Sequence, residues 1–503
     1  MAVVGAGING CAAAEHLVAE GYNVLLIDKG DFGGEASSHS GRVLHCGLQV
    51  LAPQKNIWEF IGRPGDFLMR LRVARQMAED HAELCRTVPG RLKAMDIAVP
   101  IYRDAGYAGW QVDFGARLIR YFNGGRNQFG YRRWKYPSQS PHPFASALQN
   151  RDRLESVVAF TDQRIDWPDR MAIDAALDAE DMGATIRNFT SVESLSPGLN
   201  GLWQLRLADR IQSDQVTDVS AHIVLNLGGA GVDRVIDCVR TNHDVRRKIT
   251  AVKGVYILAR LPPEYQATGV AGMNRIGEPI CCLPWGDLHY IGPTETLFEG
   301  DIENATPGED DIRFLLDEIR YFLPAITVSR KDVIMAWAGV RPITNAVGYP
   351  KGKRLPFNVL HDLDAEGLPG IFALSWGIVV NHRSTARRIV AAVSSRIAPS
   401  RQMSAVSYQP RQFPPSSSPR LQPDHPATLD DVRYCIEHEH AQGIAGVLFR
   451  RTGLAWTTTL NRQSVEKTGQ IVGQALGWRR KDTDQEISNF IQYLQSHHCF
   501  ELV

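Results

Sequence analysis

The sequence lacks a net charge and any long apolar run. Its 503 residues carry 55 Lys and Arg against 55 Asp and Glu, so the formal charge is zero. Without a basic field, long-range electrostatics do not draw a nucleic acid or an anionic membrane to the protein as a whole. The chain has no stretch of the ~18 to 20 consecutive apolar residues that a membrane span needs, and Met1 leads directly into Ala2 without a cleavable signal. We expect a cytoplasmic protein with no nucleic-acid partner.

Paired cysteines are also missing. The sequence has 8 cysteines with no CxxC pair and no zinc-finger spacing, which argues against a small disulfide scaffold and a Cys-rich metal site. We expect reduced thiols and no metal. Cys281 and Cys282 are adjacent, but neighbouring residues of a strand point to opposite faces. We therefore expect this pair to be buried and not to work as a dithiol.

Size and composition indicate a folded protein with more than one packed unit. Hydrophobic residues make up 44% and charged residues 22% of the chain, close to the averages of globular proteins. A length of 503 residues predicts roughly two or three units. Residues 409–426 are rich in Pro and Ser, which is typical of a linker. Helical patterns follow at 429–451, 465–476 and 483–497, and they predict a small helical domain at the C-terminus.

The strongest motif is Gly5-Ala6-Gly7-Ile8-Asn9-Gly10, which matches GxGxxG. It follows a short apolar strand, opens a helix, and precedes a second strand that ends in an acid, Asp28, about 20 residues later. In such a turn the glycines let the backbone approach a pyrophosphate, the helix N-terminus faces the anion, and the acid accepts hydrogen bonds from ribose hydroxyls. The motif predicts a dinucleotide site, and a glycine turn without a ligand is the alternative.

The segments after this turn favour FAD over NAD. Residues 29–38 form a loop of small residues that can wrap a pyrophosphate, where an NAD-binding domain would continue into another strand. A second glycine cluster, 228–231, follows an apolar strand predicted at 221–227 and lets backbone approach a ligand closely. Residues 249–296 alternate like antiparallel strands, which indicates a second sheet inserted into the parallel one. Further elements are predicted as helices at 66–88 and 169–181 and as strands at 184–192 and 202–207.

Taken together, these segments resemble the FAD-dependent glycerol-3-phosphate dehydrogenases, a family within the D-amino-acid-oxidase-like flavoproteins. The resemblance is carried by short segments spread over the whole chain. In order they are VVGAGING (3–10), ASS (36–38), VLHCGL (43–48), KG (253–254), LPW (283–285), IGPT (291–294), AGVRP (338–342), DVRY through EHE (431–439) and RRT (450–452). Such a set is specific at the level of the family.

The resemblance implies an α/β fold with a Rossmann-type FAD-binding domain, an inserted antiparallel-sheet substrate domain and a small C-terminal helical domain. It implies an FAD-dependent oxidoreductase region at 1–408, a Pro/Ser-rich linker at 409–428 and a helical cap at 429–503. Within the first region, FAD-binding segments are expected at about 1–60, 150–235 and 335–398, and the substrate domain at about 61–149 and 236–334. The FAD-binding residues expected from it are Gly5, Gly7, Asn9, Gly10, Asp28, Ser37, Ser38, Val192, Gly228, Gly339 and Gly377.

The implied reaction is oxidation of a CH–OH donor by hydride transfer to the flavin. The donor would be glycerol 3-phosphate, a related polyol phosphate or a hydroxy acid, and the electron acceptor would be a quinone or oxygen. Quinone-linked members of the family associate peripherally with membranes, so peripheral contact with the inner membrane is left open.

The expected substrate site departs from the family pattern. Gln49 stands where the family has Arg, Ile378 stands where it has Lys, and Tyr256 follows a KG pair that is no longer followed by Ser-His. Each charge-assisted contact to a phosphate is worth about 1.5 to 3 kcal/mol, so an altered phosphate pocket is expected. Arg341 remains, and we expect it to clamp an anionic or carbonyl oxygen, because a guanidinium does not act as a base. A structural ion pair is the alternative for Arg341.

His45 is the predicted proton acceptor, because a pKa of about 6.5 suits removal of a hydroxyl proton. A histidine hydrogen-bonded beneath the flavin is the alternative, and a covalent flavin link through His45 or Cys46 is another. Arg42 and Arg383 are candidates for a replacement cation in the substrate site. Three further side chains, which would face the flavin or pack in the core, are Tyr256, Trp376 and His382.

Three functions follow from these residues. The first is a flavin-dependent dehydrogenase acting on a CH–OH donor. The second is an amine or amino-acid oxidase of the same superfamily that uses oxygen. The third is a flavin-binding protein whose catalysis has decayed. The substitutions at Gln49 and Val50, where the family has Arg-Tyr, and at Ile378 keep the second and third open.

Overall fold

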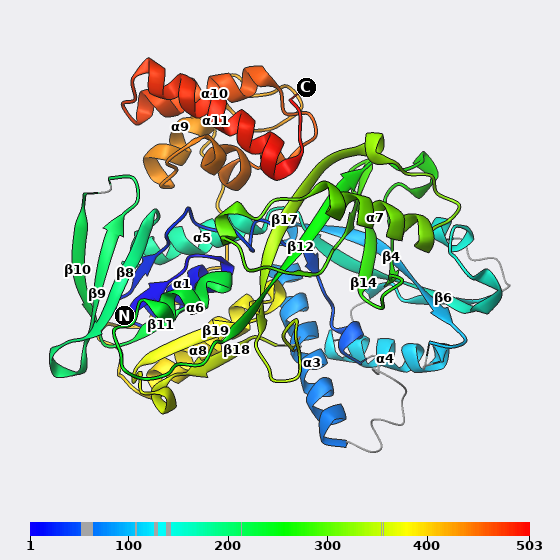
Figure 1. The fold of residues 1–503 in the computed structure, drawn as a ribbon, viewed down its shortest axis with the longest axis horizontal. Coiled ribbons are helices and arrows are strands. Elements are labelled where there is room, and N and C mark those ends of the chain that lie inside the picture. The colour runs from blue at the N-terminus through cyan, green and yellow to red at the C-terminus, as the bar shows by residue number, and fades with distance from the viewer. Residues whose placement is uncertain are drawn as a thin grey trace.

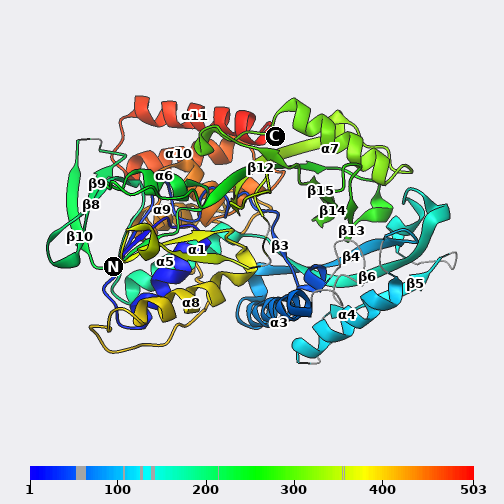
Figure 2. The ribbon, with the colours of Figure 1, turned by 60° about the horizontal axis from the view of Figure 1, so that its bottom comes forward.

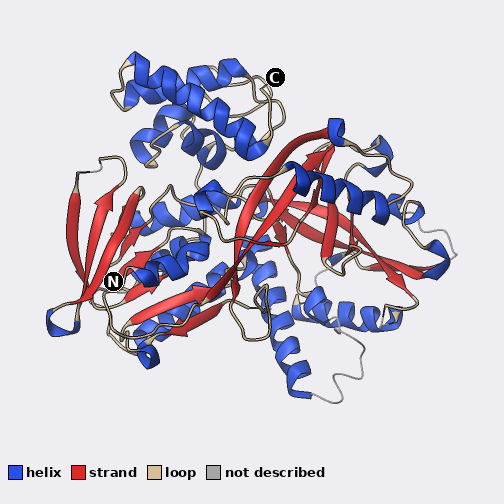
Figure 3. Cartoon of the chain, in the orientation of Figure 1, coloured by secondary structure: helices blue, strands red, loops and turns tan. Residues whose placement is uncertain are grey.

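The computed structural model describes residues 1–51, 64–105, 108–124, 129–136, 142–212, 214–353, 355 and 357–502. Figure 1 shows three bodies, which are a sheet with helices near the N-terminus, a larger sheet beside it, and a group of helices at the C-terminus that lies above both. Figure 3 shows that the described part of the C-terminal body consists of helices and loops, whereas the other two are built on strands.

The elements have the following bounds. The helices are α1 (Ile8–Ala19), α3 (Pro64–Thr87), α4 (Gly109–Phe122), α5 (Pro168–Asp181), α6 (Val232–Asp237), α7 (Glu309–Phe322), α8 (His382–Ser394), α9 (Leu429–His438), α10 (Arg462–Ala475) and α11 (Arg480–His498). The strands are β1 (Ala2–Val4), β2 (Leu25–Ile27), β3 (Val43–Leu44), β4 (Leu92–Tyr102), β5 (Arg132–Lys135), β6 (Leu154–Ile165), β7 (Thr185–Arg187), β8 (Thr190–Pro197), β9 (Trp203–Asp209), β10 (Val216–Ala221), β11 (Val224–Asn226), β12 (Ile249–Ala259), β13 (Thr268–Met273), β14 (Pro279–Trp285), β15 (Leu288–Gly292), β16 (Thr296–Leu297), β17 (Val333–Thr344), β18 (Val359–Asp362) and β19 (Ile371–Ser375).

The first sheet has the strand order β18-β19-β11-β1-β2-β7. All its neighbouring strands pair in parallel except β18 and β19, which are antiparallel. β1 lies between β2 and β11, so the carboxyl ends of these three strands meet at one edge. Val3, Leu26 and Leu225 of these strands are buried in one core with side chains of α1, α5 and α8. Figure 2 shows these three helices together beside the sheet.

The secondary structure around the first sheet confirms part of the prediction. The helices predicted at 66–88 and 169–181 are present as α3 and α5, and the strand predicted at 221–227 is present as β11. Residues 184–192 form two strands instead of one, because the chain turns at Phe189, whose φ is +47°. β10 was not predicted from the sequence, and it pairs with β9 and β8 in a three-stranded antiparallel sheet.

The second sheet has ten strands and carries the expected antiparallel region. Its main order is β16-β12-β15-β14-β13-β4-β6-β3, with β17 paired to β12 and β5 paired to β6. The strands predicted within 249–296 are confirmed as β12 to β16. α7 covers one face of this sheet, where Cys282 is buried, and Cys281 packs in the core on the other face. All eight cysteines are free, and the adjacent pair is divided between two cores as predicted.

The C-terminal domain consists of α9, a π-helix at Gly446–Arg451, α10 and α11. The prediction of one helix over 429–451 is wrong. α9 ends at His438, because His440 has a φ of +57°, which a right-handed helix does not allow. The helices predicted at 465–476 and 483–497 are confirmed as α10 and α11, and residues 409–426, all of which are described, contain no helix.

Trp337 of β17 lies where the second sheet meets the C-terminal domain. It is fully buried, stacks on Tyr256 with ring centroids 5.4 Å apart, and meets Trp456 edge-on with centroids 5.9 Å apart. These residues share one hydrophobic core with α9, α10 and α11. The contact between the sheet and the C-terminal domain is therefore a continuous apolar core, unlike the more polar interfaces that separate mobile domains.

The substitution Trp337→Ala should destabilise the protein by about 3 to 5 kcal/mol, because it removes a large buried ring and leaves a cavity. Urea unfolding followed by tryptophan fluorescence and circular dichroism measures this loss. The control is Trp110→Ala, which truncates a side chain that is 61% exposed and should change stability by less than about 0.5 kcal/mol. Similar losses for the two variants would contradict the central position of Trp337.

Candidate active site

The GxGxxG turn joins β1 to α1 and brings three backbone segments into contact. Gly5 has a φ of +102°, and a Cβ added there would lie 2.6 Å from the carbonyl oxygen of Leu227. A Cβ added at Gly10 would lie 1.8 Å from the carbonyl oxygen of Gly5. Both positions require glycine, so α1 begins directly against the end of β1. The N-terminus of α1 thereby lies at the carboxyl edge of the sheet, where its N–H groups can bind an anion.

Residues 29–42, called the dinucleotide loop from here on, connect β2 to β3 and lie against this turn. The Gly33 amide donates to the Ala6 carbonyl at 2.8 Å. The Ile8 amide, in the first turn of α1, donates to Ser37 Oγ at 3.0 Å. The loop that was predicted to wrap a pyrophosphate is thus held beside the anion-binding end of the helix.

Asp28 lies at the end of β2, as the motif predicts. Its Oδ2 accepts a hydrogen bond from the Ala6 amide at 2.6 Å, and its Oδ1 accepts one from the Gly30 amide at 2.8 Å. Its side chain is partly exposed, yet burial by the surrounding protein raises its pKa. Each carboxylate oxygen has two lone pairs, so Asp28 can hold the turn and still accept the ribose hydroxyls that the sequence assigns to it.

The second glycine cluster lies directly beside the first. A Cβ on Gly5 would lie 2.7 Å from the Cα of Gly228, and added Cβ atoms on Gly229 and Gly231 would meet open space. The space above Gly229 and Gly231 leaves room for a ligand at the carboxyl edge of β1. Val192 lies on β8, in the three-stranded sheet, and packs partly buried on the core beneath that edge.

A buried asparagine, Asn358, links the turn to the far end of the sheet. Its Nδ2 donates to Asn9 Oδ1 at 3.2 Å, and its Oδ1 accepts a hydrogen bond from the Ile378 amide at 2.6 Å. Trp376 and Gly377, just before Ile378, have φ values of +72° and +25°. Left-handed backbone is rare for a bulky residue such as Trp and concentrates at functional sites. This strained turn brings Gly377 next to Asn9, as expected if both line the cofactor site.

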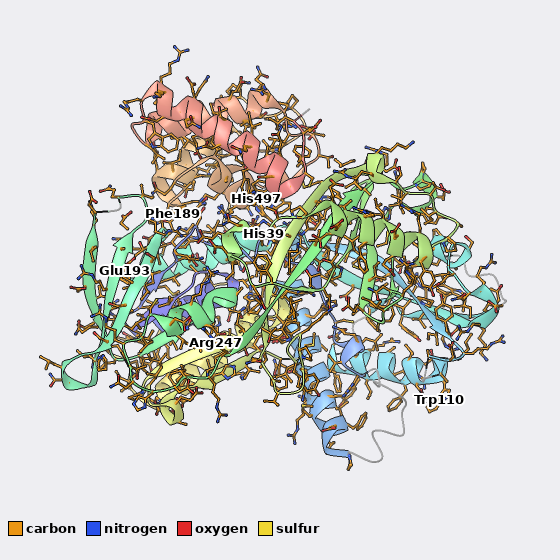
Figure 4. All side chains as sticks on the ribbon, viewed as in Figure 1. His39, Trp110, Phe189, Glu193, Arg247 and His497 are labelled. Atoms are coloured by element: carbon orange, nitrogen blue, oxygen red, sulfur yellow. The ribbon has the colours of Figure 1, made fainter. Side chains whose placement is uncertain are left out.

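The dinucleotide loop also lies on the second sheet. A Cβ on Gly339 of β17 would lie 2.7 Å from the backbone oxygen of His39, and a Cβ on Gly41 would lie 2.4 Å from the hydroxyl oxygen of Tyr256 on β12. Only glycine at these two positions lets loop and sheet approach so closely. Figure 4 shows His39 between the first sheet and the C-terminal helices. The loop therefore has contacts with all three bodies of the protein.

Arg341 lies on the same face of the second sheet, next to Gly254. Its Nη1 donates to Glu295 Oε1 at 3.0 Å, and its Nη2 donates to the Thr294 carbonyl at 2.9 Å. Burial lowers its pKa, and the carboxylate of Glu295 compensates the buried charge. The structure thus gives Arg341 the ion pair that was the alternative to substrate contact, although a quarter of its side chain is still exposed.

His45 directly follows β3. Its side chain is exposed, yet the surrounding protein desolvates it enough to lower its pKa. β3 pairs with β6 so that Leu44 lies opposite Gln163, and the register brings His45 next to Asp162. Asp162 also pairs with His81 of α3 at 3.3 Å. Burial opposes protonation of His81, but Asp162 outweighs it and raises the pKa of His81 to about 9.

The other candidates for the substrate site divide into two groups. Gln49 is exposed on a short 3-10 helix that follows His45, and Ile378 packs on the same apolar cluster as Val50. Arg383 instead lies against α3 and residue 408, where its Nη1 donates to Thr87 Oγ1 at 2.6 Å. His382 is buried and bonds the Val379 carbonyl through Nδ1 at 2.7 Å. Arg383 and His382 thus have structural partners away from Gln49.

Arg42, the other candidate cation, is buried between aromatic rings. Its guanidinium carbon lies 3.9 Å from the ring centroid of Trp456 and 5.0 Å from that of Trp285. Its Nη2 donates to the Ser38 carbonyl at 2.9 Å, and Ser38 Oγ donates to Asp169 Oδ2 at 3.1 Å. Burial lowers the pKa of Arg42 to about 10. This cation therefore holds the dinucleotide loop and is not available to a substrate.

Three residues of the site were not found from the sequence. Asn358 and Asp162 lie in segments without any motif, so no local pattern could have singled them out. Glu295 directly follows the IGPT segment and pairs with Arg341. An acid next to a predicted strand of the arginine-bearing sheet was a signal in the sequence that could have been used.

The residues present fit a flavin dinucleotide. The turn offers a helix N-terminus that only glycines could form, an accessible carboxylate at the end of β2, and a second glycine cluster with open space above it. Gly5, Gly7, Gly10, Asp28, Ser37 and Gly228 lie together at this edge. A flavin dinucleotide bound there would be held through backbone N–H groups and Asp28, and it would supply a hydride acceptor.

Two family models match the chain. The model for the FAD dependent oxidoreductases matches residues 1–375. The model for the C-terminal domain of alpha-glycerophosphate oxidase matches residues 400–483. The first covers well over half of the chain. The second covers α9, the π-helix and α10 of the helical domain and ends at the start of α11.

Known proteins agree with these models. The glycerol-3-phosphate dehydrogenase of Synechocystis sp. is 22% identical over 548 residues, covering 98% of this chain and 96% of that protein. The mitochondrial glycerol-3-phosphate dehydrogenase of Bos taurus is 26% identical over 555 residues, covering 98% of this chain and 72% of that protein. The crystal structure of glycerol-3-phosphate dehydrogenase from Bacillus halodurans complexed with FAD shares the fold, with a TM-score of 0.69 and 17% identity over 98% of this chain and 94% of that one. The chain belongs to the family of FAD dependent oxidoreductases, and FAD is its cofactor.

Proposed function

We propose that this enzyme oxidises the secondary hydroxyl of glycerol 3-phosphate or of a related polyol phosphate or hydroxy acid. The observation that carries the proposal is the position of His45, an exposed imidazole one short strand beyond the dinucleotide loop. A base in this position is close in the chain to the residues that would hold the cofactor. The glycerol-3-phosphate dehydrogenases that the chain resembles over its whole length support this class of donor.

The reaction then needs one base and one oxygen-binding group from the protein. FAD supplies the hydride acceptor. Neutral His45 takes the hydroxyl proton as the hydride leaves the same carbon, so that the alcohol becomes a ketone and the imidazole becomes imidazolium. The neighbouring Asp162 carboxylate favours the protonated ring. Arg341, held by Glu295, offers its remaining exposed edge to the ketone oxygen.

Glycerol 3-phosphate should bleach the flavin of the purified enzyme under anaerobic conditions. The variant His45→Gln should slow this reduction about 10²- to 10⁴-fold, the usual contribution of general base catalysis, without changing the flavin spectrum. The wild-type rate should fall only well below pH 6.5, since the lowered pKa keeps His45 neutral to more acidic pH. Stopped-flow absorbance over a pH series measures both effects. The matched control His222→Gln changes an exposed histidine elsewhere, and an equal loss there would exclude His45 as the base.

The phosphate end of the donor is the part of the site that departs from the family. Gln49 is exposed near His45, and Ile378 offers only an apolar side chain. Arg341 carries a charge that Glu295 already compensates. We infer that a phosphate dianion is held less tightly here than by a site with two additional cations.

The double variant Gln49→Arg, Ile378→Lys should lower the KM for glycerol 3-phosphate about tenfold or more, because each restored charge-assisted contact is worth about 1.5 to 3 kcal/mol. The KM for unphosphorylated glycerol serves as the control and should not fall. Steady-state assays with an artificial electron acceptor provide both values. An unchanged KM for the phosphorylated donor would show that these two positions do not face the phosphate.

An amine or amino-acid oxidase that uses oxygen is the second candidate. The neutral residues at positions 49 and 378 favour it, because an unphosphorylated donor needs no cation there. Bleaching of the flavin by amines or amino acids, with no response to any polyol or hydroxy acid, would move the assignment to this class. A bound flavin that no donor of either class bleaches would point to decayed catalysis.

We also propose that the enzyme docks on an anionic membrane through α4 and passes electrons to a quinone there. No helix in the described ranges is long and apolar enough to cross a membrane. Trp110, Phe114 and Tyr121 of α4 are 61%, 54% and 78% exposed, and spacings of four and seven residues put them on one face with the exposed Arg117. α3 lies alongside and exposes Leu68 and Met69 at its N-terminal end. Figure 4 shows Trp110 at the outer edge, away from the C-terminal domain.

The chemistry of this face fits the headgroup region of a bilayer. Trp and Tyr prefer the membrane interface, and an arginine among them is attracted to anionic lipids. Because the protein has no net charge, attraction to such a surface has to come from a local patch. A quinone dissolved in the same membrane would then be accessible to the docked enzyme, and oxygen is the acceptor if docking fails.

The enzyme should co-sediment with vesicles of phosphatidylglycerol and phosphatidylcholine. The triple variant Trp110→Gln, Phe114→Gln, Tyr121→Gln should remain in the supernatant while its flavin is still bleached normally. The control Leu199→Gln removes an equally exposed apolar side chain from the opposite part of the protein and should sediment like wild type. Wild-type protein that stays in the supernatant, or that forms a dimer which the triple variant abolishes, would reject the membrane and favour a second copy of the chain on this face.

A further inference from the structure

The C-terminal domain contacts the dinucleotide loop at both of its ends. At the first end, Asp31 is buried with only 1% of its side chain exposed, and it pairs with the fully buried Arg451. Arg451 Nη1 donates to Asp31 Oδ2 at 2.6 Å, and Nη2 donates to Oδ1 at 2.9 Å. Burial opposes ionisation of Asp31, but Arg451 and Arg450 outweigh it and hold its pKa at about 2. The pair is therefore ionised at neutral pH.

Arg451 is itself fixed within the C-terminal domain. Its Nε donates to the Glu439 carbonyl at 2.8 Å, and its Nη1 also donates to the Gly446 carbonyl at 2.9 Å. The guanidinium thus uses its donors in a planar, fixed arrangement that a lysine does not reproduce. Asp31 is thus held by Arg451 of the C-terminal domain and by Asn188, whose Nδ2 donates to Asp31 Oδ1 at 2.9 Å.

At the second end, Arg42 is held by Trp456 of the same domain. Its guanidinium carbon lies 3.9 Å from the centroid of the indole ring, within the range of a cation–π interaction. Between the two ends, the ring of His39 lies 6.2 Å from that of Trp456 and 5.8 Å from that of His498. The loop is therefore enclosed between the C-terminal domain and the glycine turn.

The middle of the loop supports the turn that binds the cofactor. Gly33 donates to Ala6, and Ser37 accepts from the Ile8 amide at the start of α1. A displacement of Asp31 or Arg42 would move these contacts, since they lie only two to five residues away. The contacts form a continuous series from the C-terminal domain to the N-terminus of α1.

We propose that the C-terminal helical domain holds the dinucleotide loop in its FAD-binding conformation, with Arg451 and Trp456 as positioning residues for the cofactor. The proposal rests on the FAD site described above. It gives this domain a role in cofactor retention that is independent of any contact with the substrate.

The test compares FAD release from the holoenzyme and from three variants. Arg451→Met removes the pair from the side of the C-terminal domain, and Asp31→Asn removes it from the side of the loop. Both should release FAD at least tenfold faster on dilution, measured as the rise of free-flavin fluorescence. The double variant should be no faster than Arg451→Met alone, because the two changes remove one interaction. Hydrogen exchange should increase in residues 29–42 of each variant.

The matched control is Glu318→Gln in α7. Glu318 is a buried carboxylate paired with Arg275 at 2.7 Å, with 2% of its side chain exposed, and it has no contact with the loop among the interactions described. It should lower thermal stability while FAD release stays within twofold of wild type. If Arg451→Met does not fold, Arg451→Lys replaces it and should show a smaller acceleration. FAD release from Arg451→Met or Arg451→Lys as slow as wild type, or from Glu318→Gln as fast as Asp31→Asn, would overturn the proposal. A strictly additive double variant would also overturn it.

A failure of the FAD site itself would look different. Wild-type protein would then contain no flavin and would bind none, whatever residue stands at 451. A failure of the present inference leaves wild-type FAD binding intact and only removes its dependence on the C-terminal domain.

Discussion

The close approach of backbone segments at the end of β1 is the constraint on which the site depends. A side chain at Gly5 or Gly10 would overlap a carbonyl oxygen, so the helix that follows can begin only where these two residues are glycine. Their packing brings the N-terminus of α1 to the carboxyl edge of the parallel sheet. The dipole and the N–H groups at that end suit this edge to a bound diphosphate. The dinucleotide loop and the second glycine cluster both lie against this turn.

The dinucleotide loop connects the N-terminus of α1 to His45, the proposed base. It follows β2, contacts the glycine turn through Gly33 and Ser37, packs against Gly339 of the second sheet, and leads through β3 to His45. One continuous segment thus links the residues proposed to hold the cofactor to His45, the proposed base. The same segment is fixed by ion pairing and by aromatic contacts from the C-terminal domain. If the proposals above hold, residues 29–42 connect the C-terminal domain both to the cofactor and to His45.

The sequence predicts those parts of the structure that depend on local pattern. The glycine turn, the acid at the end of β2, the antiparallel strands β12 to β16 and the helices α10 and α11 all follow from spacing and periodicity. The break after α9 was missed because it depends on a left-handed residue, His440, that is not glycine. The partner of Arg341 and the pairing of Asp31 with Arg451 could not be predicted either, since they join residues that only the tertiary fold brings together.

We propose that FAD bound at the glycine turn has its ring beside His45 and the exposed edge of Arg341. A crystal structure of the yellow holoenzyme with a bound alcohol or ketone tests it most directly. We expect a diphosphate against the N-terminus of α1 and the donor oxygen within hydrogen-bond reach of the His45 ring. Protein that carries no flavin, or a ring that lies far from His45, would contradict it.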